Sequence, residues 1–321
     1  MRLTVKVILS ILSFLPFSIH AQRTDTLIHK LDSLNHKTEI RGKQNNNVNS
    51  KTYSDSTNLN FKTYFVLLGS DLKQEFTKPF HMTGQDWGRF AKWAVVLGAV
   101  GLTDEPVQRF SVRLMANNPG LQHVSSYVTK FGASYEFYTL AGFGAYGLIF
   151  KSNKMKTTTL LATQAYLTGA ALESVLKYIS GRTRPSFYDP SVEAEPKFLG
   201  PFSKTYKDAS GKTSYSSFPS GHTTVAFAAA TVFAKEYNNT PIVGVIAYSA
   251  ATLVGLSRIT ENVHWASDVF VGATVGYLAG REVVNNYHRF MKLRQPKKGN
   301  ISFMLQPFYG KLLPGLVYNF K

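Results

Sequence analysis

Phe-Pro-Ser-Gly-His-Thr-Thr, at residues 218–224, closes a long polar loop and opens an alanine-rich segment of helical length. Gly221 lets a ligand approach the backbone closely, because it has no side chain. Ser220 and the amide groups at the start of the predicted helix would suit an anion. His222 can donate a proton to a leaving oxygen, since the pKa of histidine lies near neutral pH. A serine cap followed by two turn-forming residues would produce the same pattern, so this stretch alone leaves both interpretations open.

Upstream, residues 177–185 read Lys-Tyr-Ile-Ser-Gly-Arg-Thr-Arg-Pro and end another predicted helix. Lys177 and Arg184 are two fixed cations at this end, and the planar guanidinium of arginine can bind two phosphate oxygens at once. Two ordinary roles compete with this one. Cations at a helix C-terminus interact favourably with the helix dipole, and Glu173 stands four residues before Lys177, at the spacing of a surface ion pair.

Downstream, residues 257–268 read Ser-Arg-Ile-Thr-Glu-Asn-Val-His-Trp-Ala-Ser-Asp. His264 and Asp268 are four residues apart, so in a helix they would share a face and the carboxylate could accept the imidazole proton. The other ring nitrogen would then be free as a nucleophile or base. Arg258 adds a third cation, and Trp265 is expected to pack beside the histidine. An ordinary helix with a polar face remains the alternative.

Together the three stretches have the order Lys-x6-Arg-Pro, Pro-Ser-Gly-His and Ser-Arg-x5-His-x3-Asp. This combination resembles the type 2 phosphatidic acid phosphatase and vanadium haloperoxidase superfamily, which includes the bacterial class A acid phosphatases. The resemblance covers residues 160–285 firmly and the preceding helices loosely. One departure is local: many members carry glycine where Asn262 stands, two residues before the histidine of the third motif.

The resemblance implies a role for each matching residue. His264 would be the nucleophile that takes the phosphoryl group as a phosphohistidine, and Asp268 would orient it. His222 would protonate the leaving alcohol and then activate water. The phosphate oxygens would be bound by three cations and two residues of the central motif: Lys177, Arg184, Arg258, Ser220 and Gly221. No cofactor is expected, and vanadate is expected to bind as a phosphate mimic.

Physical chemistry supports these roles, because phosphoryl transfer spreads negative charge over three oxygens and is catalysed mainly by electrostatic stabilisation. Three fixed cations could supply that stabilisation without a metal ion. The loop acids Asp189, Glu193 and Glu195 have no spacing that resembles a metal site. The sequence therefore predicts a site with no metal.

Apolar runs of helical length alternate with polar breaks from residue 62 to residue 290. A capping box at Thr83–Asp86 begins the first predicted helix, Asp104 begins the second, and Gly181 ends the fifth. We predict an all-α fold, a helical bundle with about six core helices. The candidate helices cover residues 84–102, 105–116, 120–131, 136–150, 156–181, 221–237, 241–257 and 266–287.

The charge-free runs within these helices bear on membrane insertion. Most are shorter than the about 20 residues that a membrane-spanning helix needs. The longest, residues 237–257, contains two asparagines and a proline. These lengths favour buried helices of a globular bundle, although alanine- and glycine-rich helices also pack in lipid. The expected membrane contact is therefore peripheral.

The two ends of the chain differ from this helical part. Residues 1–21 have a basic start, a short apolar run and a small residue, Ala21, which is typical of a cleaved signal peptide; an uncleaved anchor is the alternative. Residues 22–61 are polar and predict a flexible linker. The tail, residues 291–321, contains two short candidate strands at 301–305 and 316–320, around Gly310 and Pro314-Gly315, and predicts a short β-hairpin.

The amino-acid composition restricts the kinds of site and binding partner that the protein can have. The 321 residues include no cysteine, which excludes disulfides, thiolate zinc sites and a cysteine nucleophile. Lys and Arg number 36 against 19 Asp and Glu, a net charge of +17 that suits anionic partners. Because export argues against nucleic acid, we expect a phosphorylated small molecule or lipid, at a membrane surface in the periplasm or cell envelope. The sequence leaves the oligomeric state open.

We therefore expect a metal-independent phosphatase that hydrolyses phosphomonoesters or diphosphates, such as a lipid phosphate or an isoprenoid diphosphate, through a phosphohistidine. Two alternatives remain. A vanadium-dependent haloperoxidase would hold vanadate with the same residues, and a non-catalytic envelope protein would bind phosphate without turnover.

Overall fold

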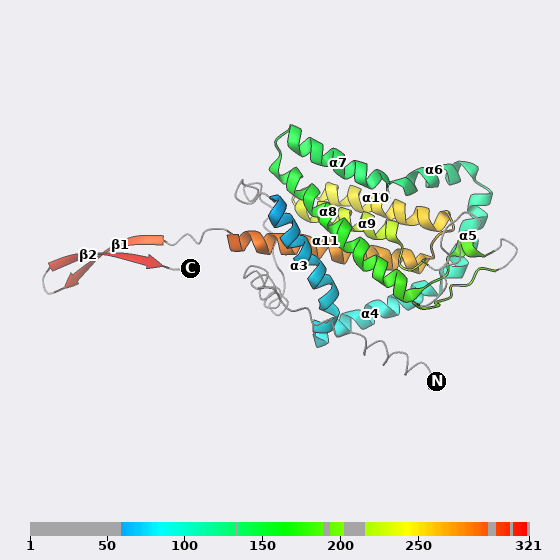
Figure 1. The fold of residues 1–321 in the computed structure, drawn as a ribbon, viewed down its shortest axis with the longest axis horizontal. Coiled ribbons are helices and arrows are strands. Elements are labelled where there is room, and N and C mark those ends of the chain that lie inside the picture. Colours follow the sequence, from blue (N-terminus) through cyan, green and yellow to red (C-terminus); the bar gives the residue numbers. More distant parts are fainter. Residues whose placement is uncertain are drawn as a thin grey trace.

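The computed structural model describes residues 59–132, 134–188, 193–201, 216–294, 300–308 and 311–319. The signal peptide predicted for residues 1–21 and all but the end of the linker predicted for 22–61 lie outside the described residues. The described chain forms a bundle of α-helices, and Figure 1 shows a two-stranded sheet beyond the end of the last helix. The predicted all-α fold class is confirmed, with the hairpin as a small addition.

Nine α-helices occur among the described residues. They are α3 (Phe61–Thr77), α4 (Gly84–Gly101), α5 (Asp104–Ala116), α6 (Pro119–Lys130), α7 (Ser134–Ile149), α8 (Asn153–Ser180), α9 (Gly221–Glu236), α10 (Pro241–Thr260) and α11 (Ala266–Arg294). Two short 3-10 helices, η3 (Lys78–His81) and η4 (Pro185–Phe187), follow α3 and α8. Each of the eight helices predicted from sequence has a counterpart here.

The local signals that bound these helices act as predicted. Thr83 and Asp86 form a reciprocal capping box, in which the Thr83 amide donates to Asp86 Oδ2 at 3.1 Å and the Asp86 amide donates to Thr83 Oγ1 at 3.3 Å. Gly181 ends α8 in the left-handed conformation, with φ of 51°. Glycine adopts that conformation at little cost, which is why the helix stops there.

Two helices differ from the prediction. α3 was not predicted, and α11 extends to Arg294 instead of residue 287. In both segments polar side chains face the interior: Asp71 of α3 is buried, and so are His288 and Arg289 in the extension of α11. A buried face made partly of polar residues lacks the apolar periodicity that identifies helices in a sequence.

The C-terminal strands are β1 (Asn300–Phe308) and β2 (Lys311–Asn319), which pair antiparallel with Phe308 opposite Lys311. The predicted hairpin is thus present, and it is longer than the two short strands expected. Pro314 and Gly315 lie within β2, opposite Leu305 and Met304, so they are not part of the turn.

α9 occupies the centre of the bundle and contacts α8, α10 and α11 (Figure 1). The close approach of α9 and α11 depends on three glycines of α11, spaced four residues apart: Gly272, Gly276 and Gly280. A Cβ atom on Gly272 would lie 2.6 Å from the Ser220 carbonyl oxygen, and one on Gly276 would lie 2.9 Å from the Ala228 amide nitrogen. These are distances that side-chain atoms do not adopt, so the glycines set the separation of the two helices.

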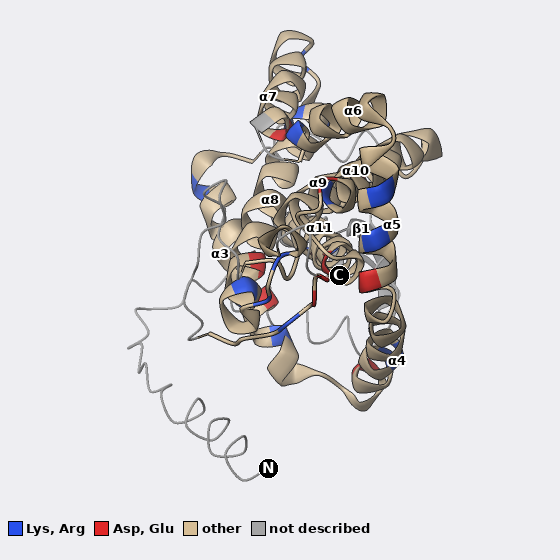
Figure 2. Ribbon diagram, turned by 90° about the vertical axis from the view of Figure 1, so that its right-hand side faces the viewer, with Lys and Arg blue, Asp and Glu red and all other residues tan. Residues whose placement is uncertain are grey.

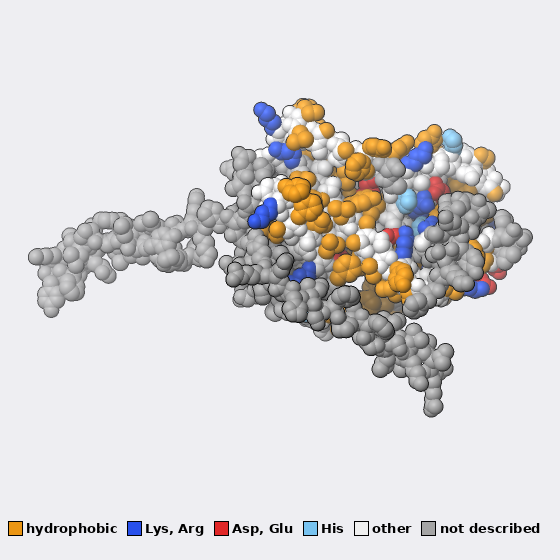
Figure 3. Space-filling model, viewed as in Figure 1, with side chains coloured by type: hydrophobic (Ala, Val, Ile, Leu, Met, Phe, Trp, Pro, Cys, Tyr) orange, Lys and Arg blue, Asp and Glu red, His pale blue; other side chains and the backbone are white. Residues whose placement is uncertain are grey.

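The outer surface of the bundle is largely apolar. α4 has no buried residue, and Trp87, Phe90 and Val95 on it are all exposed. α6, α7 and α10 carry one charged residue each, and tan dominates these helices in Figure 2. Orange side chains gather over the face seen in Figure 3. The expectation that the apolar helices are buried as in a soluble globular bundle is therefore wrong for this surface, because run length does not reveal which faces a neighbour covers.

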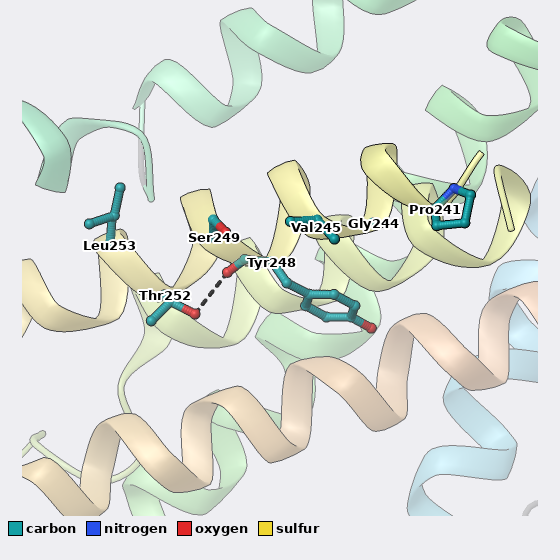
Figure 4. Close-up of a pocket in the computed structure, with 7 residues that line it drawn as sticks. All are labelled: Pro241, Gly244, Val245, Tyr248, Ser249, Thr252 and Leu253. Carbon is teal, nitrogen blue, oxygen red and sulfur yellow. Dashed lines mark hydrogen bonds between the residues drawn. The ribbon is translucent and has the colours of Figure 1, made fainter.

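One described helix, α10, is long and apolar enough to cross a membrane by length and composition. An open groove of about 720 Å³ runs along its outer face (Figure 4). The groove is lined by α10 alone, through Pro241, Gly244, Val245, Tyr248, Ser249, Thr252 and Leu253.

Candidate active site

The three sequence motifs meet at one end of the bundle. The first follows the end of α8, the second begins α9, and the third joins the end of α10 to the start of α11. Charge effects show that they converge: the cations Lys177, Arg184 and Arg258 all lower the pKa values of both His222 and His264. All three motifs therefore contribute to a single cationic site.

His264 is buried, and its ring orientation is set by a backbone group. Its Nδ1 atom lies 2.7 Å from the Ser217 carbonyl oxygen. A carbonyl oxygen only accepts hydrogen bonds, so Nδ1 carries the proton and Nε2 keeps its lone pair. Burial and the surrounding cations hold the pKa of His264 well below its usual value, which keeps the ring neutral. The geometry therefore presents a neutral imidazole with a free Nε2.

The predicted pairing of His264 with Asp268 is different in the structure. Asp268 Oδ2 lies 3.6 Å from His264 Nδ1, beyond hydrogen-bond distance, and Ser217 takes the place of the acceptor. His264 precedes α11, whereas Asp268 belongs to its first turn and accepts from the Trp265 amide at 2.9 Å. The spacing of four residues is thus that of a helix cap and not of two residues on one helix face.

Asp268 is fully buried and has several donors. Its carboxylate accepts from Arg182 Nη1 and from the Ser217 hydroxyl, each at 2.5 Å. Burial raises the pKa of Asp268, while Arg182 and these hydrogen bonds act in the opposite direction. Asp268 therefore acts on His264 in two ways. Its Oδ2 atom lies 3.6 Å from Nδ1, close enough for an electrostatic interaction, and it also accepts a hydrogen bond from Ser217, whose carbonyl oxygen binds His264.

His222 lies in the first turn of α9 and faces the same cations. Burial, followed by the charges of Arg258, Lys177 and Arg184, lowers the pKa of His222 to about 3. Without a bound anion His222 is therefore neutral near pH 7. Gly132 packs directly against it, since a Cβ atom there would lie 3.0 Å from His222 Cβ.

Each of the three predicted phosphate-binding cations has a partner. Lys177 pairs with Glu173 as the sequence indicated, and Arg184 Nη2 donates to the Ser216 carbonyl oxygen at 3.2 Å. Arg258 Nη1 donates to Thr129 Oγ1 at 2.7 Å and to Glu261 Oε2 at 2.6 Å. Among the described residues, its buried Nε atom has no hydrogen-bond partner.

Ser220 and Gly221 lie at the N-terminus of α9. The Ser220 hydroxyl does not cap the helix, and it bonds instead with Thr223 Oγ1 at 2.8 Å. This argues against the plain capping interpretation of the motif. A Cβ atom on Gly221 would lie 2.6 Å from Glu173 Oε1 and 3.2 Å from Lys177 Nζ. The ends of two α8 side chains therefore lie directly against Gly221, and its amide belongs to the unsatisfied first turn of a helix.

The backbone conformation at Asn262 explains the one departure from the motif. Its φ angle is 55°, in the left-handed region, and its Oδ1 atom accepts from Gln108 Nε2 at 2.9 Å. Glycine and asparagine are the residues that adopt this conformation most readily. Asparagine therefore fulfils the backbone requirement that glycine would meet at this position.

Residues that the sequence did not single out complete the site. Arg182 stands between Lys177 and Arg184, yet its guanidinium turns inward to Asp268 and to Asp104. Asp104 begins α5 as predicted, but its side chain is buried in the same network. Nothing in its sequence context signals this contact, because 78 residues separate it from Arg182. Trp265 packs beside the site as expected, buried and donating to the Thr183 carbonyl oxygen at 2.8 Å.

The loop acids have surface partners where they are described. Glu193 pairs with Arg109 and Glu195 with Lys197, whereas Asp189 lies outside the described residues. Within the described ranges, no group of three or more metal-ligating side chains is arranged to hold a metal ion.

Residues 158–292 match the family model described as the PAP2 superfamily. Lipid A 1-phosphatase of Porphyromonas gingivalis is 52% identical over 69 residues, which are 21% of this chain and 16% of that protein. Lipid phosphate phosphatase 1 of Arabidopsis thaliana is 35% identical over 127 residues, 35% of this chain and 38% of that protein. Undecaprenyl-diphosphatase of Sulfolobus acidocaldarius is 30% identical over 152 residues, 47% of this chain and 63% of that protein. The chain thus spans less than two thirds of each relative.

Among solved structures, Aquifex aeolicus LpxE aligns with a TM-score of 0.42 at 25% identity, covering 57% of this chain and 94% of that one. A transmembrane PAP2-type phosphatidylglycerolphosphate phosphatase from Bacillus subtilis also aligns with a TM-score of 0.42, at 24% identity, covering 60% and 91%.

Proposed function

Residues 158–292 match the PAP2 superfamily, and on that premise we propose that the protein is a PAP2-type phosphatase that hydrolyses phosphorylated lipids or isoprenoid diphosphates through a phosphohistidine. The observation that carries the proposal is the state of His264. A neutral imidazole with Nε2 free, surrounded by three cations, is suited to attack phosphorus.

In the first step, Nε2 of His264 attacks phosphorus and forms a P–N bond while the P–O bond to the leaving group breaks. The developing negative charge on the phosphoryl oxygens is stabilised by Lys177, Arg184 and Arg258. The leaving oxygen takes a proton from protonated His222 and departs as an alcohol or a phosphate.

The proton on His222 must arrive with the substrate. The pKa of His222 is about 3 in the free site, because burial and then the charges of the neighbouring cations lower it. A phosphate group cancels their charge and raises that pKa. Phosphomonoesters have a second pKa of about 6, so the monoanion can bring the proton into the site and transfer it to His222.

In the second step, water loses a proton to His222, and its oxygen attacks the phosphorus of phosphohistidine. The P–N bond breaks, inorganic phosphate leaves, and His264 regains its free Nε2. His222 returns protonated and must lose that proton before the next cycle.

The substrate class is inferred from the relatives and from the surface. All three named relatives act on lipid or isoprenoid phosphates or diphosphates by their names. The exposed apolar side chains of α4, α7 and α10 suit contact with acyl chains, and the groove lies on α10, the helix that carries Arg258 in its last turn. We infer that the protein acts at a membrane of the cell envelope, after export by the predicted signal peptide.

The test is phosphate release in EDTA from phosphatidate, a polyprenyl diphosphate and a soluble phosphomonoester. Wild type is compared with His264→Ala and with His123→Ala, a histidine exposed on α6. We expect release by wild type and His123→Ala, loss of at least about 1,000-fold in His264→Ala, and a preference for the lipids. Near-normal release by His264→Ala would overturn the nucleophile. No release by folded wild type would overturn the phosphatase, and vanadate-dependent halide oxidation would then separate the haloperoxidase from a binding protein.

A further inference from the structure

Arg182 lies between two buried carboxylates behind the candidate nucleophile. Its Nη2 atom donates to Asp104 Oδ2 at 2.6 Å, and its Nη1 atom donates to Asp268 Oδ1 at 2.5 Å. Arg182, Asp104 and Asp268 are 3%, 1% and 0% exposed, so water does not screen these charges. The rings of Phe198 and Trp265 lie against the guanidinium at 4.7 and 5.7 Å. A single arginine therefore joins α5 to the first turn of α11 inside the protein.

Ser217 connects this ion pair network to His264 at three points. Its amide donates to the Arg182 carbonyl oxygen at 3.1 Å, its hydroxyl donates to Asp268 Oδ2 at 2.5 Å, and its carbonyl oxygen accepts from His264 Nδ1 at 2.7 Å. The atom that selects the His264 tautomer is thus held in place by the two partners of the buried ion pair. Turning the imidazole would break its hydrogen bond to Ser217, and the position of Ser217 is in turn held by its hydrogen bonds to Arg182 and Asp268.

Asp104 holds the other side of the network. Its Oδ1 atom accepts from the Ser267 amide at 2.8 Å, and its Oδ2 atom accepts from the Ser267 hydroxyl at 2.6 Å. Ser267 directly precedes Asp268, so Asp104 fixes the start of α11 as well as the position of Arg182.

We propose that Asp104 and Arg182 are positioning residues for the reaction: they hold Asp268 and Ser217, and through them the tautomer and orientation of His264. This inference rests on the proposed function. It adds α5 to the functional unit, since Asp104 lies outside the residues 158–292 that match the family model. The two residues do not touch the phosphate, which Lys177, Arg184 and Arg258 would bind.

The positioning role predicts that substitutions lower kcat and leave KM nearly unchanged. In Asp104→Asn the shape is kept and the charge is lost, so Arg182 and the start of α11 lose a partner that holds them in register. A displacement of the nucleophile by 1 Å can cost about 100-fold in rate. We expect kcat to fall between about 10-fold and 100-fold, while KM and the Ki of inorganic phosphate change less than about twofold, since the phosphate-binding cations are intact. The Ki of vanadate, which mimics the transition state, should rise in proportion to the fall in kcat.

The matched control is Asp71→Asn. Asp71 is equally buried, on α3 toward the other part of α11, where it accepts from Asn286. We expect its kcat and vanadate Ki to equal those of wild type, even where its Tm falls. Arg182→Lys tests the second residue: one ammonium cannot hold both carboxylates as the guanidinium fork does, so kcat should lie between wild type and Arg182→Gln.

The outcomes distinguish a failure of the proposed function from a failure of the positioning role. If wild type releases no phosphate, the proposed function fails first. If wild type is active and Asp104→Asn has normal kcat, or loses kcat and phosphate affinity together, the positioning role is overturned. If Asp104→Asn does not fold, Ser267→Ala decides, because it removes hydroxyl contacts to Asp104 and Arg182 and leaves every charge in place. Wild-type kcat and vanadate Ki in Ser267→Ala would then overturn the proposal.

Discussion

Gly276→Ala tests how closely the two helices that carry the catalytic groups must approach. A Cβ atom at this position would lie 2.9 Å from Phe227 Cβ and 2.9 Å from the Ala228 amide nitrogen, and closer still to the Thr224 carbonyl oxygen. Carbon atoms in contact prefer about 3.5–4.0 Å, so α9 and α11 would have to separate by about 1 Å. Two of these contacts are backbone atoms of a helix, which cannot rotate away as a flexible side chain would.

The cost follows from that separation. Overpacking a core costs about 1–3 kcal/mol, and a rigid backbone neighbour places this substitution at the upper end, about 3 kcal/mol. The better helix propensity of alanine returns at most about 1 kcal/mol. For a helical domain of this size the net loss of about 2–3 kcal/mol lowers Tm by roughly 4 °C or more. Because α9 begins with the phosphate-binding turn and α11 with Asp268, we also expect kcat to fall by about 100-fold.

Thermal unfolding followed by circular dichroism, with phosphate release on the same samples, measures both effects. Gly98→Ala on α4 is the control, since a Cβ atom there meets nothing within 4 Å. It should raise Tm slightly or leave it unchanged, with wild-type kcat. A Gly276→Ala protein that melts within about 2 °C of wild type, at full activity, would refute the close packing of α9 against α11.

Three further predictions concern single features of the site and surface. Asn262→Gly should keep the stability of wild type, whereas Asn262→Ala should lose about 1 kcal/mol in thermal unfolding because of the left-handed backbone; equal Tm values would contradict this. Since the pKa of free His222 is about 3, the substrate monoanion must supply the proton, so kcat/KM for a phosphomonoester should fall tenfold per pH unit above about pH 6; a profile flat to pH 8 would exclude that proton route. A Trp87→Glu, Phe90→Glu double substitution on the exposed face of α4 should reduce release from lipid vesicles and leave release from a soluble phosphomonoester unchanged; equal loss on both would argue against membrane contact through α4.

Much of the helical architecture could be predicted because its signals are local. A capping box, a glycine in the left-handed conformation and an apolar run each act over a few residues, and they bound α4 and α8 as expected. α3 was missed because Thr63, Ser70 and Asp71 are among its buried residues. The interior face of α3 is polar, and only its packing against α11 explains why these polar residues are buried.

The candidate site, too, was only partly predictable from the sequence. The motifs predicted which residues converge, and the structure brings His222, His264 and the three cations together. The pairing of His264 was predicted wrongly, because a spacing of four residues does not say whether the first residue is in the helix. The acceptor is a backbone carbonyl of Ser217, which has no signature in a sequence, since every residue carries one.

The sequence by itself therefore determined eight of the nine described helices, the order of the three motifs and the chemical types present: two histidines, fixed cations and a carboxylate. Only the tertiary structure decided the tautomer of His264, the inward turn of Arg182 and the part played by Asp104. The physical reason is the separation along the chain over which each kind of interaction acts. Capping and periodicity act between neighbours in the chain, whereas charge and hydrogen bonding in a buried site act between neighbours in space, whatever the number of residues between them.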